Sequence, residues 1–225
     1  MATEAEAFSW SCTMPEKKAS SFDRRRPQAT LEADGMGKRK IPVEVARALR
    51  KAEADRSSGY MSADELLEAE GQIEEQYAWQ KTAEILNRRD CTVSELTERL
   101  AERGYGRPAI DSALAIAQKK HLVDDRRYAK RFCEQKIRAG WGRRKIELEL
   151  ARRGVALGED IGWSEAAGDE DEAEHALALA RRKHVSSGNE YQKLVRYLAG
   201  RGYSFELATR AAKQALAERR GSEDI

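Results

Sequence analysis

The chain has 225 residues, of which 36% are charged and 40% hydrophobic, and its formal net charge at pH 7 is +2. This length accommodates one domain or two, and the composition is typical of small helical units rather than of one large core. No apolar run approaches the ~18 residues that a membrane span needs. Acidic residues near the start (Glu4, Glu6) and three widely spaced cysteines without a CxxC pair argue against a signal peptide, a disulfide framework and a zinc site. We therefore expect a cytoplasmic protein.

Residues 1–72 are predicted to be an N-terminal extension that is mostly disordered, with short helices. Three of the four prolines (Pro15, Pro27 and Pro42) lie in its first part, which shows no periodic apolar face. Pro42 is suited to open a short helix at the next residue. Ser62 and Glu65 have the spacing of a capping box, which marks another helix start, and Gly71 predicts a kink or a break.

A short pattern occurs three times in the remaining chain. The segments 100–105, 150–155 and 198–203 share the form Leu-Ala-x-Arg-Gly-apolar, and their glycines, at 104, 154 and 202, lie 50 and 48 residues apart. Near-constant spacing of this kind indicates repeated supersecondary units. In each copy the glycine is placed to end a helix in the left-handed conformation, with the next apolar residue packing back on the last turn.

The fold class predicted from this repeat is all-α, with three tandem three-helix units in a curved, elongated row. We place the units at 73–121, 122–168 and 169–221. Helices are expected at 73–89, after Thr92 and near Pro108 in the first unit, and at about 171–185, 190–201 and 204–219 in the third. Units this small bury little apolar surface, so neighbours are expected to pack against each other.

The second unit has the clearest helix signals. Asp124 and Asp125 are suited to cap a helix whose apolar stripe contains Tyr128, Phe132 and Ile137. A glycine-flanked tryptophan, Trp141, separates it from a second helix that ends at Gly154. Cys133 lies on the apolar side of the first helix, where it is expected to be a buried hydrophobe. The third helix of this unit, within 157–167, is poorly defined by the sequence.

The polar residues of the second unit are mostly basic. From Asp124 to Gly154 there are eleven Lys or Arg and five acids, so the segment carries a net charge of +6. A basic face of this kind suits an acidic partner or a phosphate backbone, although a solvated helix surface explains it equally well. The residues that we expect to contact a partner are Arg126, Arg127, Lys130, Trp141, Arg143, Arg144, Lys145, Arg152 and Arg153.

An acidic run follows the basic segment. Residues 159–174 contain eight acids and no Lys or Arg. The run is consistent with a linker, with intramolecular neutralisation or with a device against nonspecific DNA binding. We favour the linker, because this stretch has few groups that could pack.

The sequence contains no recognisable catalytic, cofactor or metal site. His121, His175 and His184 are scattered and lack the spacing of a helical metal site. Neither a phosphate-binding glycine loop nor a nucleophile motif occurs. We therefore expect a protein that is not an enzyme, that needs no cofactor and that has no small-molecule substrate and no membrane association.

The motif at residues 124–155 has a counterpart in a known family. Asp124-Asp125-Arg126-Arg127-Tyr128-Ala129, Gly140-Trp141-Gly142, Ile146, Glu149-Leu150 and Gly154-Val155 together resemble the RecX regulatory proteins of bacteria. The resemblance covers about 73–220, and the long N-terminal extension and the acidic run depart from it.

This resemblance implies a negative regulator of the RecA recombinase. Such a protein would bind the RecA–single-stranded DNA filament and inhibit its extension, ATP hydrolysis, strand exchange and co-protease activity. It would thereby act in homologous recombination, DNA repair and the SOS response. The alternative is a DNA-binding protein of the helix-turn-helix type, in which Arg143, Arg144 and Lys145 would touch DNA directly. Weak direct DNA binding is a possible addition to the RecA interaction, and a helical scaffold for an unrelated protein is a third interpretation.

Overall fold

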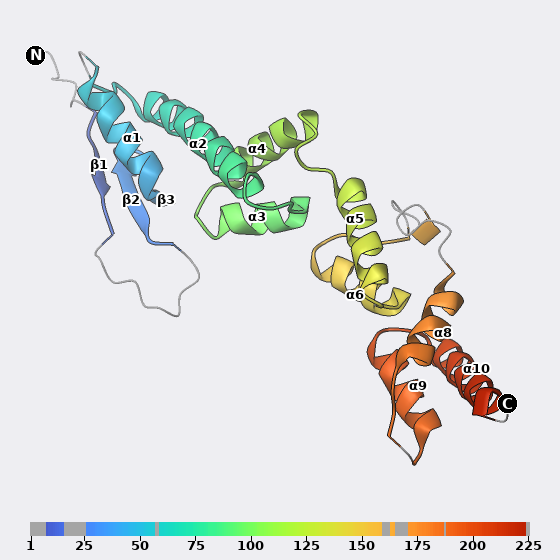
Figure 1. The fold of residues 1–225 in the computed structure, drawn as a ribbon. Helices are drawn as coiled ribbons and strands as arrows, with labels where there is room; N and C mark the ends of the chain where they lie inside the picture. Colours follow the sequence, from blue (N-terminus) through green and yellow to red (C-terminus); the bar gives the residue numbers. More distant parts are fainter. Residues whose placement is uncertain are drawn as a thin grey trace, which may run out of the picture. The chain divides into compact units, whose positions relative to one another are not determined.

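The computed structural model divides the chain into two compact units, residues 1–123 and 124–225, and each is described here by itself. The described residues are 8–15, 26–56, 59–158, 163–164, 171–186 and 188–223, with side chains described up to 220. Figure 1 shows that helices dominate both units. The predicted helical fold is therefore confirmed, and the departures from it lie in the N-terminal extension.

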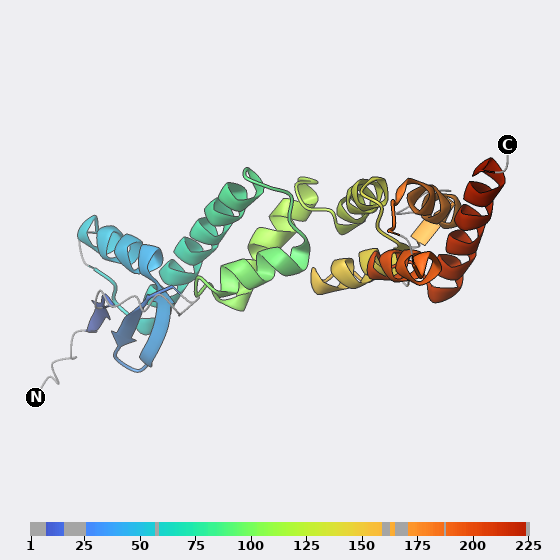
Figure 2. The same cartoon turned by 60° about the horizontal axis from the view of Figure 1, so that its bottom comes forward.

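The N-terminal compact unit begins with a small antiparallel sheet. Its strands are β1 (Trp10–Thr13), β2 (Gln28–Ala33) and β3 (Gly37–Pro42), with β2 in the centre. Ala29, Leu31 and Ala33 alternate along β2 and are buried. Helix α1 (Val43–Ala54) follows directly and buries Val45, Ala46 and Leu49, and it packs across the sheet (Figures 1 and 2).

The expectation of a mostly disordered extension is wrong for residues 8–15 and 26–56. Residues 1–7 and 16–25, which share that expectation, lie outside the described residues. One sequence signal was overlooked: Asp34-Gly35 lies in the turn between β2 and β3, and this dipeptide favours hairpins. Two of the three buried positions in β2 are alanines, so the alternation of strong apolar residues that identifies a strand was absent. The helix expected after Pro42 is confirmed as α1.

Helix α2 (Ala63–Leu86) begins where the capping box predicted. The Ser62 hydroxyl accepts a hydrogen bond from the Glu65 backbone N–H at 3.2 Å. The helix then continues through Gly71, so the predicted kink is wrong, and the expected helix 73–89 is the second half of a longer one. No neighbouring atom lies within 4 Å of a Cβ built at Gly71. No close neighbour therefore requires a glycine at this position of the helix.

Helices α3 (Val93–Ala101) and α4 (Arg107–Lys119) complete the first three-helix unit. Thr92 caps α3 by accepting from the Glu95 N–H, and Pro108 lies in the first turn of α4, as predicted. Leu96, Leu100 and Ile110 are fully buried or nearly so. They belong to one apolar core that also includes the sheet and α1. The extension is thus part of the first unit's core.

The C-terminal compact unit, residues 124–225, contains the second and third repeats. Its helices are α5 (Asp125–Arg138), α6 (Arg143–Arg152), α8 (Glu172–Arg182), α9 (Glu190–Gly200) and α10 (Phe205–Glu223). Asp124 caps α5 by accepting from the Arg127 N–H at 3.0 Å. The third set of helices lies within a few residues of its predicted limits. Residues 163–164 are helical and residues 157–158 are not, whereas the rest of the stretch expected to hold the third helix and most of the acidic run fall outside the described residues.

The three repeated glycines end their helices in the same way. Gly104, Gly154 and Gly202 have φ of +88°, +78° and +96°. In each case the residue after the glycine donates its N–H to the carbonyl five positions back, as Val155 does to Leu150 at 3.0 Å. The glycine itself donates its N–H to the carbonyl three positions back. This pair of hydrogen bonds forms a Schellman motif, so the predicted C-cap is confirmed in all three copies.

This geometry predicts opposite effects of alanine at two glycines. Gly154→Ala forces a Cβ into the left-handed region and should lower the free energy of unfolding by about 1–2 kcal/mol. Gly71→Ala lies in the middle of a helix with open space around it and should raise that free energy by about 0.5–1 kcal/mol. Urea unfolding followed by circular dichroism measures both. Equal stability of Gly154→Ala and the unaltered protein would contradict the cap.

Candidate partner-binding surface

The basic residues singled out from the sequence lie on α5, on α6 and in the turn between them. Arg126, Arg127 and Lys130 are exposed on the first half of α5. Arg144 and Arg152 are exposed on α6, where Arg152 lies 3.6 Å from the Glu149 carboxylate. Lys130 and Arg126 are one helical turn apart, so their charges project from the same side of α5. These five side chains are placed where a partner could reach them.

Trp141, by contrast, is an internal part of its unit. Its ring packs edge-on against Phe132 with the centroids 6.5 Å apart. The ammonium groups of Lys136 and Lys145 lie over the ring at 4.9 and 4.3 Å from its centroid. Such cation–π contacts engage the ring within the fold. Trp141 and Lys145 therefore stabilise the α5–α6 turn.

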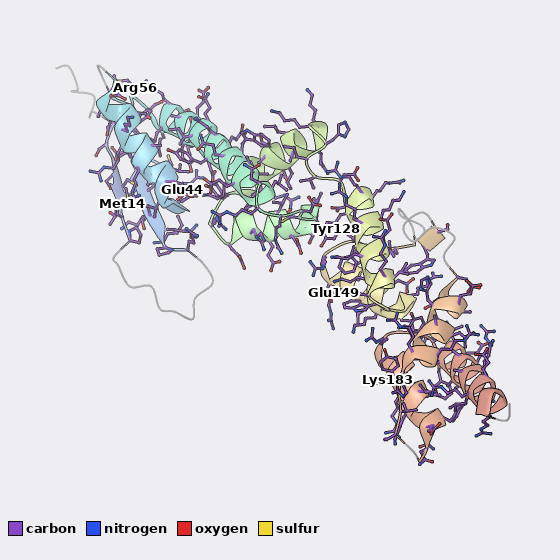
Figure 3. All side chains as sticks on the ribbon, in the orientation of Figure 1. Met14, Glu44, Arg56, Tyr128, Glu149 and Lys183 are labelled. Atoms are coloured by element: carbon purple, nitrogen blue, oxygen red, sulfur yellow. The ribbon has the colours of Figure 1, made fainter. Side chains whose placement is uncertain are left out.

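Arg153 also makes its contacts within the unit. Its guanidinium donates to the Tyr128 hydroxyl at 3.0 Å and to the Glu149 carboxylate at 3.1 Å, and it lies over the Phe132 ring. Figure 3 labels Tyr128 on α5 and Glu149 on α6. The arginine at the end of α6 thus joins the two helices, and Glu149 neutralises its charge.

Arg143 lies at the junction between the second and third repeats. Its backbone N–H donates to the Glu172 carboxylate at the start of α8, at 2.9 Å. Its guanidinium pairs with Glu147 at 2.7 Å and stacks on Trp163 at 5.1 Å. Glu172 therefore satisfies a free N–H at the start of α6 from the neighbouring repeat, which sequence reasoning did not detect.

Two glycines bring the backbones of these repeats into contact. A Cβ at Gly142 would lie 2.5 Å from the carbonyl carbon of Gly202 and from the N of Tyr203, closer than real Cβ atoms come. The Gly142 N–H donates to the Arg201 carbonyl at 2.9 Å. A Cβ at Gly202 would in turn overlap Lys145. The start of α6 is therefore covered by the turn between α9 and α10.

The nine candidates accordingly divide into two groups. Arg126, Arg127, Lys130, Arg144 and Arg152 are exposed. Arg143 is exposed as well but contacts Glu147 and Trp163, and the partly buried Trp141, Lys145 and Arg153 make specific contacts inside the second repeat. Contact with a partner stays a prediction for all nine. The ion pairs of Arg143 with Glu147 and of Arg153 with Glu149 are local i, i+4 pairs. The aromatic partners of these arginines are distant in sequence and come close only in the folded chain, so the sequence alone did not separate the groups.

The chemistry of the described residues is limited. They contain no cluster of three or more His, Cys, Asp or Glu side chains arranged to hold a metal ion. Cys133 is fully buried, and burial raises the pKa of its thiol to about 11, so the reactive thiolate is scarce at neutral pH. Among the described helices none is long and apolar enough to cross a membrane.

Two segments of the chain match models of a known protein family. Residues 124–157 match the family model described as the second three-helix domain of RecX, and residues 169–211 match the third.

Full-length relatives extend the match. The chain is 35% identical over 127 residues to the regulatory protein RecX of Vibrio parahaemolyticus, which covers 55% of this chain and 81% of that protein. It is 37% identical over 136 residues to the RecX of Chromohalobacter salexigens, covering 58% and 88%. The chain belongs to the RecX family.

Crystal structures of RecX proteins share the fold. RecX from Lactobacillus salivarius superimposes with a TM-score of 0.52 at 18% identity, over 63% of this chain and 96% of the other. A second RecX structure gives the same TM-score at 19% identity and covers 87% of this chain. The RecX fold therefore extends to most of the chain.

The division of the basic residues can be tested by stability. Arg153→Ala removes charged hydrogen bonds to Tyr128 and Glu149 and should lower the free energy of unfolding of this RecX family member by about 2 kcal/mol. Arg144→Ala changes an exposed side chain and should alter it by less than about 0.5 kcal/mol. Thermal unfolding of both variants is the measurement. Equal stability of the two variants would mean that Arg153 has no structural role.

Proposed function

We propose that this protein is a negative regulator of the RecA recombinase that binds the RecA–single-stranded DNA filament. The observation that carries the proposal is its relationship to regulatory proteins named RecX, which extends over 81% of the Vibrio parahaemolyticus protein. Bound to the filament, the protein would inhibit filament extension, and losses of ATPase, strand-exchange and co-protease activity would follow. Its cellular setting would be the cytoplasm, in homologous recombination, DNA repair and the SOS response.

The charge distribution supports this proposal. A RecA–DNA filament carries the phosphate backbone of its strand, and a basic protein surface is attracted to such a polyanion. Arg126, Arg127, Lys130 and Arg144 are exposed on two adjacent helices of the second repeat. The curved row of repeats expected from the sequence would suit a filament, and it stays a prediction.

The helix-turn-helix alternative is disfavoured by the junction. A recognition helix reads bases with the residues of its N-terminal part. Here the start of α6 is covered, since Gly142 bonds to Arg201, Glu172 accepts from the Arg143 N–H and Lys145 packs on Trp141. Arg144 alone of the three basic residues at 143–145 has no such contact described. Reading of duplex DNA by α6 would require the two repeats to separate.

The proposed function predicts inhibition of RecA. Titration of the protein into the DNA-dependent ATPase reaction of RecA from the same organism, on single-stranded DNA, should lower ATP hydrolysis at sub-stoichiometric amounts. Action on growing filament ends produces this stoichiometry, because one bound molecule then affects many RecA protomers. An undiminished ATPase at an excess of the protein would refute the proposal.

A pair of charge reversals tests the exposed basic residues. Lys130→Glu with Arg144→Glu should weaken inhibition at least about tenfold, because the polyanion would then meet two like charges, while helicity is kept. The matched control, Arg210→Glu with Lys213→Glu, makes the same change of charge at exposed positions of α10. Equal loss in both variants would show a nonspecific charge effect and would remove the assignment to α5 and α6.

A further inference from the structure

A basic hollow that the sequence did not indicate lies between the second and third repeats. It has a volume of about 370 Å³ and lies where the end of α5 meets α8 and α9. Four cationic side chains line it: Arg138 from α5, Arg182 and Lys183 from the end of α8, and Arg201 after α9. Figure 3 labels Lys183 at this end of α8. Tyr197, Leu179 and the turn residues Ala139 and Gly140 complete the lining.

None of the described side chains that line the hollow is acidic. The neighbouring Arg181 shows the contrast, because it forms a two-point ion pair with Glu218 at 2.7 and 2.6 Å. Arg138 and Arg182 are exposed, and the cations of Lys183 and Arg201 lie over the Tyr197 ring at 5.1 and 5.0 Å. Four positive charges therefore converge on one hollow without a counter-charge in its lining.

Helix capping accounts for only one of these cations. The carbonyls at the end of α8 already accept from Arg219, whose guanidinium lies 2.8 Å from Ala180 O and 2.9 Å from Lys183 O. Arg201 serves the end of α5 in the same way, bonding to Ala139 O at 2.8 Å. A helix end contributes about half a negative charge, so the end of α5 offsets only a small part of the four positive charges.

The equivalent position in the second repeat shows how such a charge is neutralised there. Arg153 and Arg201 both stand directly before the capping glycine of their repeats. Four residues earlier, the second repeat has Glu149, which pairs with Arg153, and the third has Tyr197. The ring holds the Arg201 guanidinium in place without cancelling its charge. The third repeat thus retains the positive charge that the second neutralises.

We propose that this hollow binds the phosphodiester groups of a nucleic acid. Three arginines and a lysine around one cavity match closely spaced negative charges, as a polynucleotide backbone supplies, better than they match a single carboxylate. Arg138, Arg182 and Lys183 hold the phosphates, and Arg201, fixed by Ala139 and Tyr197, forms the rigid wall. This proposal rests on the proposed function only for the nucleic acid that the protein meets in the cell, because binding at the hollow itself does not require RecA.

The test measures nucleic-acid binding by the full-length protein alone. The probe is a fluorescent oligodeoxythymidylate, and a duplex of equal length is the second arm. Arg138→Ala with Arg182→Ala should remove two phosphate contacts. For single strands each contact contributes about 0.7 to the slope of log K against log salt, so the slope should fall by about 1.4 and affinity at about 0.1 M salt by about 25-fold. Arg210→Ala with Lys213→Ala, which removes the same charge from α10, should bind as the unaltered protein does.

The outcomes are distinct. Loss of oligonucleotide binding in the hollow variant alone supports the site, and the arm with the higher affinity identifies a single strand or a duplex as the source of the phosphates. Unchanged affinity and salt slope in the hollow variant would overturn it. So would competition by polyglutamate as effective per charge as that by unlabelled oligonucleotide, because the site would then be a general anion site. RecA ATPase inhibition, measured separately, reports on the proposed function, so the two can fail independently.

Discussion

The contact between the turn at residues 140–142 and the turn at 201–203 is the constraint on which the C-terminal unit depends. The second and third repeats have separate apolar cores. They are joined by a close backbone approach that only glycine permits at positions 142 and 202, with a hydrogen bond from Gly142 to Arg201. The side chains of Glu172 and Arg201 add hydrogen bonds to Arg143 N–H and Ala139 O. This arrangement covers the start of α6 and creates the hollow at the end of α5. The accessible charge of the unit therefore follows from how two turns meet.

The placement of acids decides which arginines remain available to a partner. Glu149, Glu172 and Glu218 each engage an arginine or its backbone, and in each case the guanidinium or helix end becomes part of the fold. The described lining of the basic hollow contains no acid, so the charges of Arg138 and Arg182 stay on the surface. A net charge of +6 counted along the segment 124–154 could not distinguish these cases, because a sum of charges does not show which acid engages which arginine, and Glu172 and Glu218 lie outside that segment.

The helical part of the fold could be predicted from local signals that act within a few residues. Asp124, Thr92 and Ser62 cap helices, and Gly154 ends one, as their types and spacing indicate. The sequence does not reveal the sheet, because two of the three residues that β2 buries are small alanines. The kink predicted at Gly71 does not occur, because one glycine costs a helix only about 1 kcal/mol. The candidate site was predicted only in its overall charge. The roles of Trp141 and Arg153 depend on contacts between helices, which one sequence does not reveal.

The N-terminal sheet packs against the first helical repeat. In a stacked array, the first unit has a neighbour on one side only, and its free end must be covered. The sheet and α1 share the apolar core of the first repeat, and Tyr105, beside that repeat's capping glycine, donates to Glu44 of α1 at 2.8 Å. Gln28 of β2 occupies the space over Gly104. The sheet and α1 thus cover the end of the first repeat where its capping glycine lies, so that this end is closed by β structure and not left open to solvent.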